Sequence, residues 1–399
     1  MGKDFSFLTV VQFLDAFNEN YFKYLVIYYL IVFEGVQSTS MITSIAGAAF
    51  ILPFIFFSSF GGDFADRWRK TSVICGTRFA QVFFMILAWF FVKFHGGGLI
   101  YVILFLVATT AAIFGPSKYG IIAEIVTSKK LIRANGIVAA LTYFGIIFGT
   151  SFASWTDALF KQDYVGMVEI ALCISLLGSL LSLGISKTAV AAPNQKRSFF
   201  VYREIVESLR DMRGKPGMLT AMFCYSYLLF LGAYMQMNII PYSIDTLKMG
   251  AAVGGYLFLI LSVGLGIGAL IASRLSGTLS HLPWYGFGMS IGCYLFTLFP
   301  LPIWLNFLWL IGIGILGGLF LVPPQTYIMA KSSAAHKGRN FGTANFLSFV
   351  LALFAALLFY FVNVVLGVSP GVSFSWLGTL NLGVSFALFF LIKENRIIE

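Results

Sequence analysis

Long apolar runs separated by short polar segments recur along the whole chain. A membrane-spanning helix needs roughly 20 consecutive apolar residues, and these runs are continuous instead of alternating, which disfavours transmembrane strands. We therefore predict twelve transmembrane helices. Their expected ranges are 5–33, 40–61, 71–94, 98–121, 134–157, 165–187, 217–241, 250–273, 285–303, 305–330, 342–366 and 373–393.

One long polar stretch, residues 188–216, divides these spans into two groups of six. The pattern predicts an all-α membrane protein with two pseudo-symmetric six-helix halves, 1–187 and 217–399, as in many transporters. Within the stretch, residues 199–213 place apolar side chains at helical spacing, which is typical of an amphipathic helix at the membrane interface. A docking role for this basic linker is the alternative.

Composition and charge fit a membrane protein with a defined orientation. The 399 residues are 59% hydrophobic and only 11% charged, which is too apolar for a water-soluble fold. The formal net charge is +10, but it follows membrane sidedness, so it does not indicate nucleic-acid binding. Loops on one side carry Lys93, Lys161 and Lys248. Loops on the other side are much richer in Lys and Arg, with clusters at 67–70, 129–133, 187–215 and 331–339. The side that is richer in Lys and Arg is predicted to be cytoplasmic. The protein is then expected in the cell (inner) membrane, with both termini in the cytoplasm.

The first predicted span carries costly polar groups in the segment QFLDAFNENYFK. Gln12, Asp15, Glu19 and Lys23 are spaced three, four and four residues apart, so they share one helical face. A charge facing lipid near the bilayer centre costs roughly 2.5–3.5 kcal/mol on insertion scales. This face is therefore expected to look into the helix bundle or a wet cavity. Glu19 and Lys23 can also pair with each other at this spacing.

The segment GGDFADRWRK follows the second span. It resembles the loop signature of the major facilitator superfamily, with Gly62, Asp66, Arg67 and Lys70 in matching positions. Gly62 would permit close approach of helices, and Asp66 would pair with a basic residue or lie at a helix N-terminus. The resemblance implies a latch that holds one conformation of a transport cycle. The plainer interpretation is a basic membrane anchor.

Two segments, QFLDAFNENYFK and FGPSKYGIIAEIVTSKKLIRANG, are together similar to the lysophospholipid transporter family of that superfamily. The family pattern has a Gln-Phe-Leu start, an Ala-Phe-x-(Asp/Glu)-Asn core, a Pro-x-Lys-Tyr-Gly-Ile run and a later Ala-Asn. The second half has a corresponding Val-Pro, a basic loop at Lys337–Arg339 and an Ala-Asn at 344–345. The resemblance covers roughly residues 6–347. It departs from the family at Ala139, where members often have Glu.

The resemblance implies that Glu19 and Lys118 are polar groups of the substrate site. A carboxylate such as Glu19 would bind the ammonium of lysophosphatidylethanolamine, and Lys118 or Arg78 would bind the phosphate. Asp15 is also a candidate for a proton or sodium site. Interhelical pairing that fixes the bundle is the alternative for all of these groups. Lys23 and Arg78 are expected to act as pairing partners more than as ligands. Weaker candidates, which helix–helix contacts explain equally well, are Asn20, Tyr119 and Gln325.

Further residues complete the predicted latch and the helix packing. Glu124 is expected to join the latch, with Arg133 as one candidate partner, and Lys337 and Arg339 supply its basic groups in the second half. The glycine-rich stretches 263–273 and 312–325 allow close helix crossings. Pro323 and Pro324 are expected to break or kink the tenth span.

An enzyme is disfavoured because no catalytic constellation stands out. No His/Cys cluster has metal-ligand spacing, the three histidines lack an Asp five residues later, and no nucleotide-binding signature precedes a helix. We therefore expect no cofactor. The four cysteines all fall in apolar runs and are expected to be buried, inert thiols: Cys75, Cys173, Cys224 and Cys293.

The predicted function is inward movement of lysophospholipids, such as lysophosphatidylethanolamine or lysophosphatidylglycerol, across the cytoplasmic membrane by alternating access. The resemblance implies that a separate acyltransferase or acyl-carrier-protein synthetase then restores the second acyl chain. A monomer is expected, since it is the default for this fold. Two alternatives remain: a proton-coupled exporter of amphipathic small molecules, in which Asp15 and Glu19 carry protons, and a purely structural membrane scaffold, which the ionisable stripe disfavours.

Overall fold

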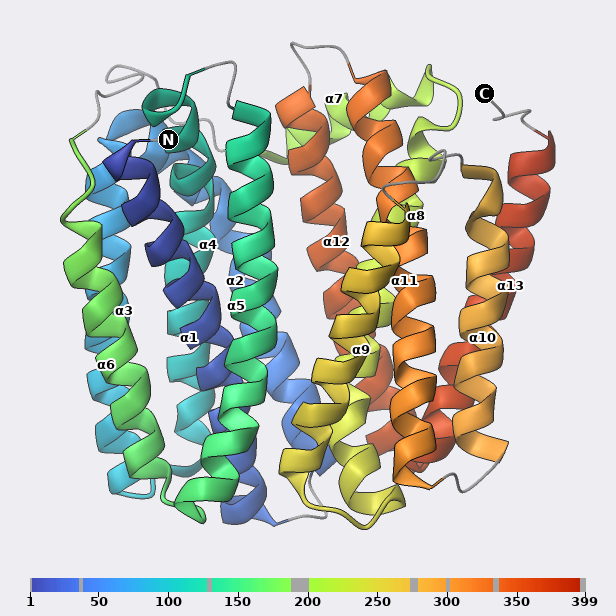
Figure 1. Ribbon diagram of the computed structural model, residues 1–399, viewed down its shortest axis with the longest axis horizontal. Helices are drawn as coiled ribbons and strands as arrows, with labels where there is room; N and C mark the ends of the chain where they lie inside the picture. Colours follow the sequence, from blue (N-terminus) through green and yellow to red (C-terminus); the bar gives the residue numbers. More distant parts are fainter. Residues whose placement is uncertain are drawn as a thin grey trace. The chain divides into compact units, whose positions relative to one another are not determined.

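The computed structural model describes residues 2–35, 39–127, 131–187, 201–272, 279–298, 302–332 and 337–394. Within these residues every regular element is a helix, which confirms an all-α protein (Figure 1). The chain folds as two compact units, unit 1 (Met1–Phe199) and unit 2 (Phe200–Glu399). The linker residues 188–200 and the side chains of Arg133, Lys337 and Arg339 lie outside the described part.

Unit 1 contains six long helices and one short 3₁₀ turn. Their bounds are α1 Lys3–Glu34, α2 Thr39–Arg67, α3 Lys70–Lys93, η2 Gly97–Leu99, α4 Ile100–Ile125, α5 Leu131–Phe160 and α6 Tyr164–Ser182. Helix α1 is central: it packs on α5, α6, α4 and α2, and Figure 1 shows it between α6 and α5. Gly149 of α5 lies against the backbone of Phe17, so α5 approaches α1 more closely than a side chain there would allow. This central place explains why α1 can carry polar groups that a lipid-facing helix cannot.

Unit 2 begins with the amphipathic helix α7. Its elements are α7 Val201–Arg213, α8 Met218–Pro241, η4 Tyr242–Thr246, α9 Ala251–Ala272, η5 Leu279–His281, α10 Leu282–Leu298, α11 Ile303–Lys331, α12 Lys337–Tyr360, η6 Phe361–Val365 and α13 Pro370–Glu394. Helix α7 packs on α8 and α12, and its Ser208 donates a hydrogen bond to Asn340, 3.1 Å away. Helices α9 and α11 cross closely through Gly264, Gly268, Gly314 and Gly318, as the glycine pattern predicted.

Several boundaries and one expected break differ from the sequence prediction. Helix α2 continues through Arg67, so most of the predicted loop signature is helical. Helix α11 runs unbroken through Pro323 and Pro324, and the expected break there is wrong. In the described residues, nine helices are long and apolar enough to cross a membrane. The count of twelve spans and the pseudo-symmetry of two six-helix halves stay predictions.

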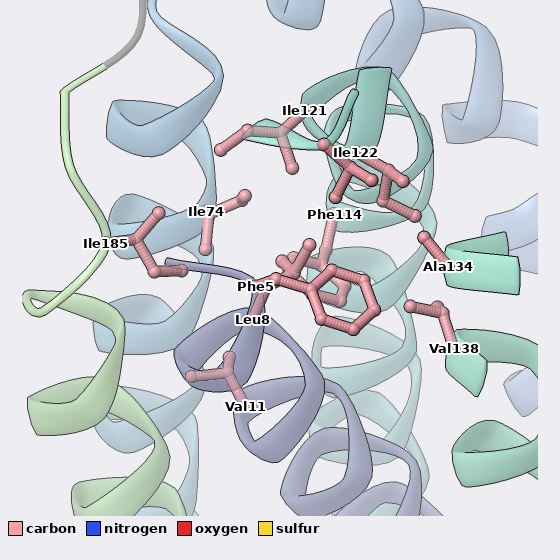
Figure 2. Packing of buried hydrophobic residues seen from close by; sticks show 11 residues of the cluster. Phe5, Leu8, Val11, Ile74, Phe114, Ile121, Ile122, Ala134, Val138 and Ile185 are labelled. Atoms are coloured by element: carbon pink, nitrogen blue, oxygen red, sulfur yellow. The ribbon is translucent and has the colours of Figure 1, made fainter. Parts of the chain in front are cut away.

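The main described apolar cluster of unit 1 lies where α1 begins (Figure 2). It joins side chains from α1, α3, α4 and α5 with Ile185, which follows α6. Phe114 of α4 belongs to this cluster, and its ring also contacts the charged groups described below. The apolar cluster therefore borders the ionisable stripe of α1 on the side of the helix N-terminus. Its members are Phe5, Leu8, Val11, Ile74, Phe114, Ile121, Ile122, Val126, Ala134, Val138 and Ile185.

Candidate substrate site

The stripe on α1 is buried inside unit 1, as the energetic cost of charge in lipid requires. Gln12, Asp15, Glu19 and Lys23 are between 2% and 7% exposed. Each turn of the helix presents one of them to a different neighbour. Gln12 donates a hydrogen bond to Thr142 of α5 over 3.0 Å.

Asp15 forms an ion pair with Arg78 of α3. Arg78 is 1% exposed and also donates a hydrogen bond to Gln81 over 3.0 Å. Its guanidinium carbon lies 4.5 Å from the centroid of the Phe114 ring, a cation–π contact. Three kinds of partner therefore hold Arg78, and the pair links α1, α3 and α4. Removing one member would leave the other charge buried without compensation.

Glu19 lies one turn along α1 from Asp15, and its electrostatic partner is Lys118 of α4. These two side chains form no ion pair within 4.0 Å in the described part of the chain, and one carboxylate oxygen of Glu19 accepts no hydrogen bond. The helical spacing would also allow Glu19 to pair with Lys23, but these two residues form no ion pair with each other in the described structure. Both Glu19 and Lys118 therefore keep bonding capacity toward a further charged group.

Lys118 shares the Phe114 ring with Arg78. Its ammonium lies 5.8 Å from the centroid of Phe114 and 4.6 Å from the centroid of Tyr119. Arg78 repels Lys118 while Glu19 attracts it. The two cations therefore lie over the same aromatic ring, and the carboxylates of Asp15 and Glu19 face them from α1. We call these four buried charged residues the charge cluster: Asp15, Glu19, Arg78 and Lys118.

The remaining predicted site residues have other environments. The side-chain amide of Asn20 donates to the carbonyl of Ala16 on its own helix, over 2.8 Å. Lys23 lies over the rings of Phe50 and Tyr24, with its ammonium 5.0 and 5.6 Å from their centroids. Tyr119 is 51% exposed. Of these three residues, Tyr119 contacts the charge cluster, through its ring and the ammonium of Lys118.

Sequence reasoning missed two residues of the cluster's surroundings. Gln81 is buried beside Arg78, and its amide nitrogen has no hydrogen-bond acceptor within the described structure. Phe114 provides the ring on which both cations stack. Each lies one helical turn from a predicted site residue, three after Arg78 and four before Lys118. Helical spacing from the predicted cations was therefore the signal that would have found them.

Two residues named for the predicted latch, Lys70 and Glu124, lie together. The ammonium of Lys70 lies 2.5 Å from a carboxylate oxygen of Glu124 and donates a hydrogen bond to it. Gly120 makes room for the stem of Lys70, because an added Cβ there would lie 2.8 Å from the Cε of Lys70. The ion pair joins the start of α3 to the end of α4. The surroundings of Gly62 and the side chains of Asp66, Arg67 and Arg133 lie outside the described part of the chain.

Residues 8–357 match the family model described as Major Facilitator Superfamily. The chain belongs to this superfamily. Among curated relatives, the lysophospholipid transporter LplT of Salmonella arizonae is 26% identical over 398 residues, 95% of this chain and 92% of the relative. The protein of the same name from Escherichia coli O157:H7 is 25% identical over 340 residues, 83% of this chain and 81% of the relative. These relatives confirm the resemblance to lysophospholipid transporters that the motifs indicated.

Solved structures support the same fold. A transporter of the POT family in complex with 5-aminolevulinic acid superposes with a TM-score of 0.74 at 14% identity, covering 99% of this chain and 96% of that one. A bacterial homologue of the human lysosomal transporter Spinster, inward-facing and unoccupied, gives 0.68 at 16% identity, covering 99% and 98%. The solved structures show the fold, and the family match with the curated relatives supports a multi-pass membrane transporter, which agrees with the expectation of a carrier.

Proposed function

We propose that this major facilitator protein moves lysophospholipids across the cytoplasmic membrane, inward and by alternating access, so that a separate acyltransferase can restore the second chain. The proposal draws on the ordered motifs in both halves and on the lysophospholipid transporters among its relatives. Lysophosphatidylethanolamine and lysophosphatidylglycerol are the proposed substrates. The protein would act as a monomer with both termini in the cytoplasm, as the distribution of Lys and Arg favours.

One observation carries the assignment of the headgroup site: Glu19 and Lys118 are buried and attract each other without forming a direct ion pair. A phosphoethanolamine headgroup carries an ammonium and a phosphate. Its ammonium would donate to the open oxygen of Glu19, and its phosphate would accept from Lys118. Asp15 and Arg78 already form a direct ion pair, so their proposed role is to position α1 against α3 and α4.

The latch has a separate part in the proposed cycle. Lys70 and Glu124 tie α3 to α4 at the end of unit 1 that the charge distribution predicts to be cytoplasmic. The Glu124 side chain is 32% exposed, so solvent and other charged groups can compete for this pair. Such a pair can be exchanged during a conformational change at small energetic cost. We assign it to holding one state of the cycle.

The test is uptake of labelled lysophosphatidylethanolamine by proteoliposomes, with albumin extraction to remove lipid left in the outer leaflet. Wild type should exceed empty vesicles. Glu19→Gln and Lys118→Gln should each lose roughly tenfold or more, the effect of one buried hydrogen bond to a charged group. Glu34→Gln is the matched control, because Glu34 is an exposed carboxylate at the C-terminal end of the same helix. No uptake by wild type would overturn the proposal.

Imposing pH and sodium gradients on the same vesicles distinguishes the lysolipid carrier from the alternative, a proton-coupled exporter. Lysolipid uptake that is indifferent to pH and sodium gradients supports a facilitative lipid carrier. Export of an amphipathic dye that needs a proton gradient, together with absent lysolipid uptake, would favour the exporter. In that case the buried carboxylates Asp15 and Glu19 become the candidate proton sites.

A further inference from the structure

Helix α6 carries a single charged side chain, Glu169, in an otherwise apolar span, and this side chain is exposed. Ionisable groups in a membrane span usually face the protein interior, because exposure to lipid is costly. Glu169 instead accepts a hydrogen bond from the indole N–H of Trp89 on α3, over 3.0 Å. It lies within two turns of the first residue of α6, which is a depth where lipid headgroups approach a helix.

Lys93 brings the opposite charge to the same place. It is exposed and ends α3, one turn after Trp89, and its ammonium lies 4.2 Å from the centroid of the Trp89 rings. Trp and Lys are typical of the membrane–water interface. Within the described part of the chain, neither Lys93 nor Glu169 takes part in an ion pair. A cation and a carboxylate therefore flank one indole, and both are exposed on the surface of the protein.

Two exposed apolar stripes run away from these three residues. On α6, the positions at spacings of four, three and four after Glu169 are exposed, namely Cys173, Leu176 and Leu180, and the exposed Leu183 follows directly after the helix. On α3, a stripe at similar spacing is also exposed: Phe79, Phe83, Ile86 and Phe90. Helices α3 and α6 pack on each other within unit 1, as Figure 1 shows. The surface of unit 1 therefore has two neighbouring apolar stripes, each starting near the oppositely charged pair Lys93 and Glu169.

We propose that Trp89, Lys93 and Glu169 form a binding site for diacyl phosphatidylethanolamine of the surrounding bilayer. The ammonium donates hydrogen bonds to Glu169, the phosphate accepts from Lys93, and the two acyl chains follow the two stripes. Phosphatidylcholine has no N–H to donate, and phosphatidylglycerol has no cation for Glu169. A single-chain lipid covers one stripe. This site is separate from the charge cluster and does not depend on what the protein transports.

Native mass spectrometry of the full chain, released from micelles with equal amounts of phosphatidylethanolamine, phosphatidylcholine and phosphatidylglycerol, tests the site. Wild type should retain phosphatidylethanolamine about two- to fivefold over the others, the range of one exposed ion pair. Glu169→Gln keeps an acceptor for the Trp89 N–H but removes the charge, so it should abolish this preference. Lys93→Gln should reduce retention of all three phospholipids.

Two control variants remove similar charges elsewhere. Glu34→Gln and Lys161→Gln alter exposed side chains at the ends of α1 and α5, and both should bind lipid like wild type. Equal retention of the three lipids by wild type, or an unchanged preference in Glu169→Gln, would overturn the site. Preferred retention of added lysophosphatidylethanolamine over the diacyl lipid would overturn the choice of occupant. Lysolipid uptake by Glu169→Gln in vesicles free of phosphatidylethanolamine should match wild type, which keeps this test apart from the transport proposal.

Discussion

The two units bury polar groups of different kinds. In the described residues of unit 1, six charged side chains are buried: Asp15, Glu19, Lys23, Lys70, Arg78 and Lys118. In the described residues of unit 2, the buried polar side chains are all uncharged. Asn381 is typical: it donates to the carbonyl of Gly286 and to Ser290 and accepts from Tyr227. The described interiors of the two units therefore differ: charged groups are buried in unit 1, and only neutral polar groups are buried in unit 2.

This difference between the units indicates which buried groups are available to bind a charged ligand. Neutral amides and hydroxyls can satisfy one another across helices, as at Asn381, and they carry no charge that needs a counter-ion. Buried charges are kept where they pair or where they have a task. The Asp15–Arg78 pair accounts for two charges of unit 1 and the Lys70–Glu124 pair for a third. Lys23 lies over the rings of Phe50 and Tyr24. Glu19 and Lys118 attract each other without a direct ion pair, so they are the best candidates for a headgroup.

The strongest way to break this comparison is to remove one member of the buried pair. Arg78→Met should lower the free energy of unfolding by about 3–5 kcal/mol, because Asp15 stays buried without its cation. The double variant Asp15→Leu/Arg78→Met should recover much of the loss, since well-packed apolar residues replace a buried pair at little cost. Thermal unfolding in detergent measures both. Equal loss in the single and double variants would show that shape, not charge, sets the stability here.

The second prediction concerns the close packing of unit 2. Gly318→Ala places a methyl group against the backbone of α9 at Leu265 and Ala269, and should cost about 1–3 kcal/mol as overpacking. Gly312→Ala is the matched control on the same helix, since nothing lies within 4 Å of its added Cβ. If both variants unfold with the same free energy as wild type, the close crossing of α9 and α11 is contradicted.

The smallest expected effect is at the latch. Lys70→Met should change the free energy of unfolding by only about 0.2–1 kcal/mol, because Glu124 is partly exposed. A double-mutant cycle with Glu124→Gln isolates the pair. Uptake should change more than stability, since the proposed role is to hold one transport state. A coupling energy above about 3 kcal/mol would instead place this pair with Asp15–Arg78 as a structural one.

The sequence predicted the elements well and their partners poorly, for a physical reason. The 3.6-residue period puts Gln12, Asp15, Glu19 and Lys23 on one face, and the cost of charge in lipid predicts that this face is inside. Neither rule says which helix lies opposite. Asp15 and Arg78 were both named as candidates, yet their pairing needed the packing of α1 on α3 and α4. Likewise, Glu124 was expected in the latch, but its partner in the described structure is Lys70.

Hydropathy also fails to separate the core from the lipid-facing surface. All four cysteines lie in apolar runs and were predicted to be buried, but Cys173 is exposed and Cys75 is partly so. In a membrane protein, an apolar side chain is equally stable facing lipid or facing another helix. For the same reason Glu169, which faces outward, had no signal beyond its isolation in an apolar run. Pro323 and Pro324 show a related limit, because α11 continues through them, as neighbouring groups in a bundle can allow.

The central claim, that Glu19 reads the headgroup ammonium, is tested most directly by comparing two substrates in one variant. Uptake of lysophosphatidylethanolamine and of lysophosphatidylglycerol should be measured in vesicles carrying wild type or Glu19→Gln. We predict that the variant loses lysophosphatidylethanolamine uptake by roughly tenfold or more and retains far more of its lysophosphatidylglycerol uptake, because the glycerol headgroup has no ammonium. Equal loss for both lipids would contradict the account and return Glu19 to a structural role within unit 1.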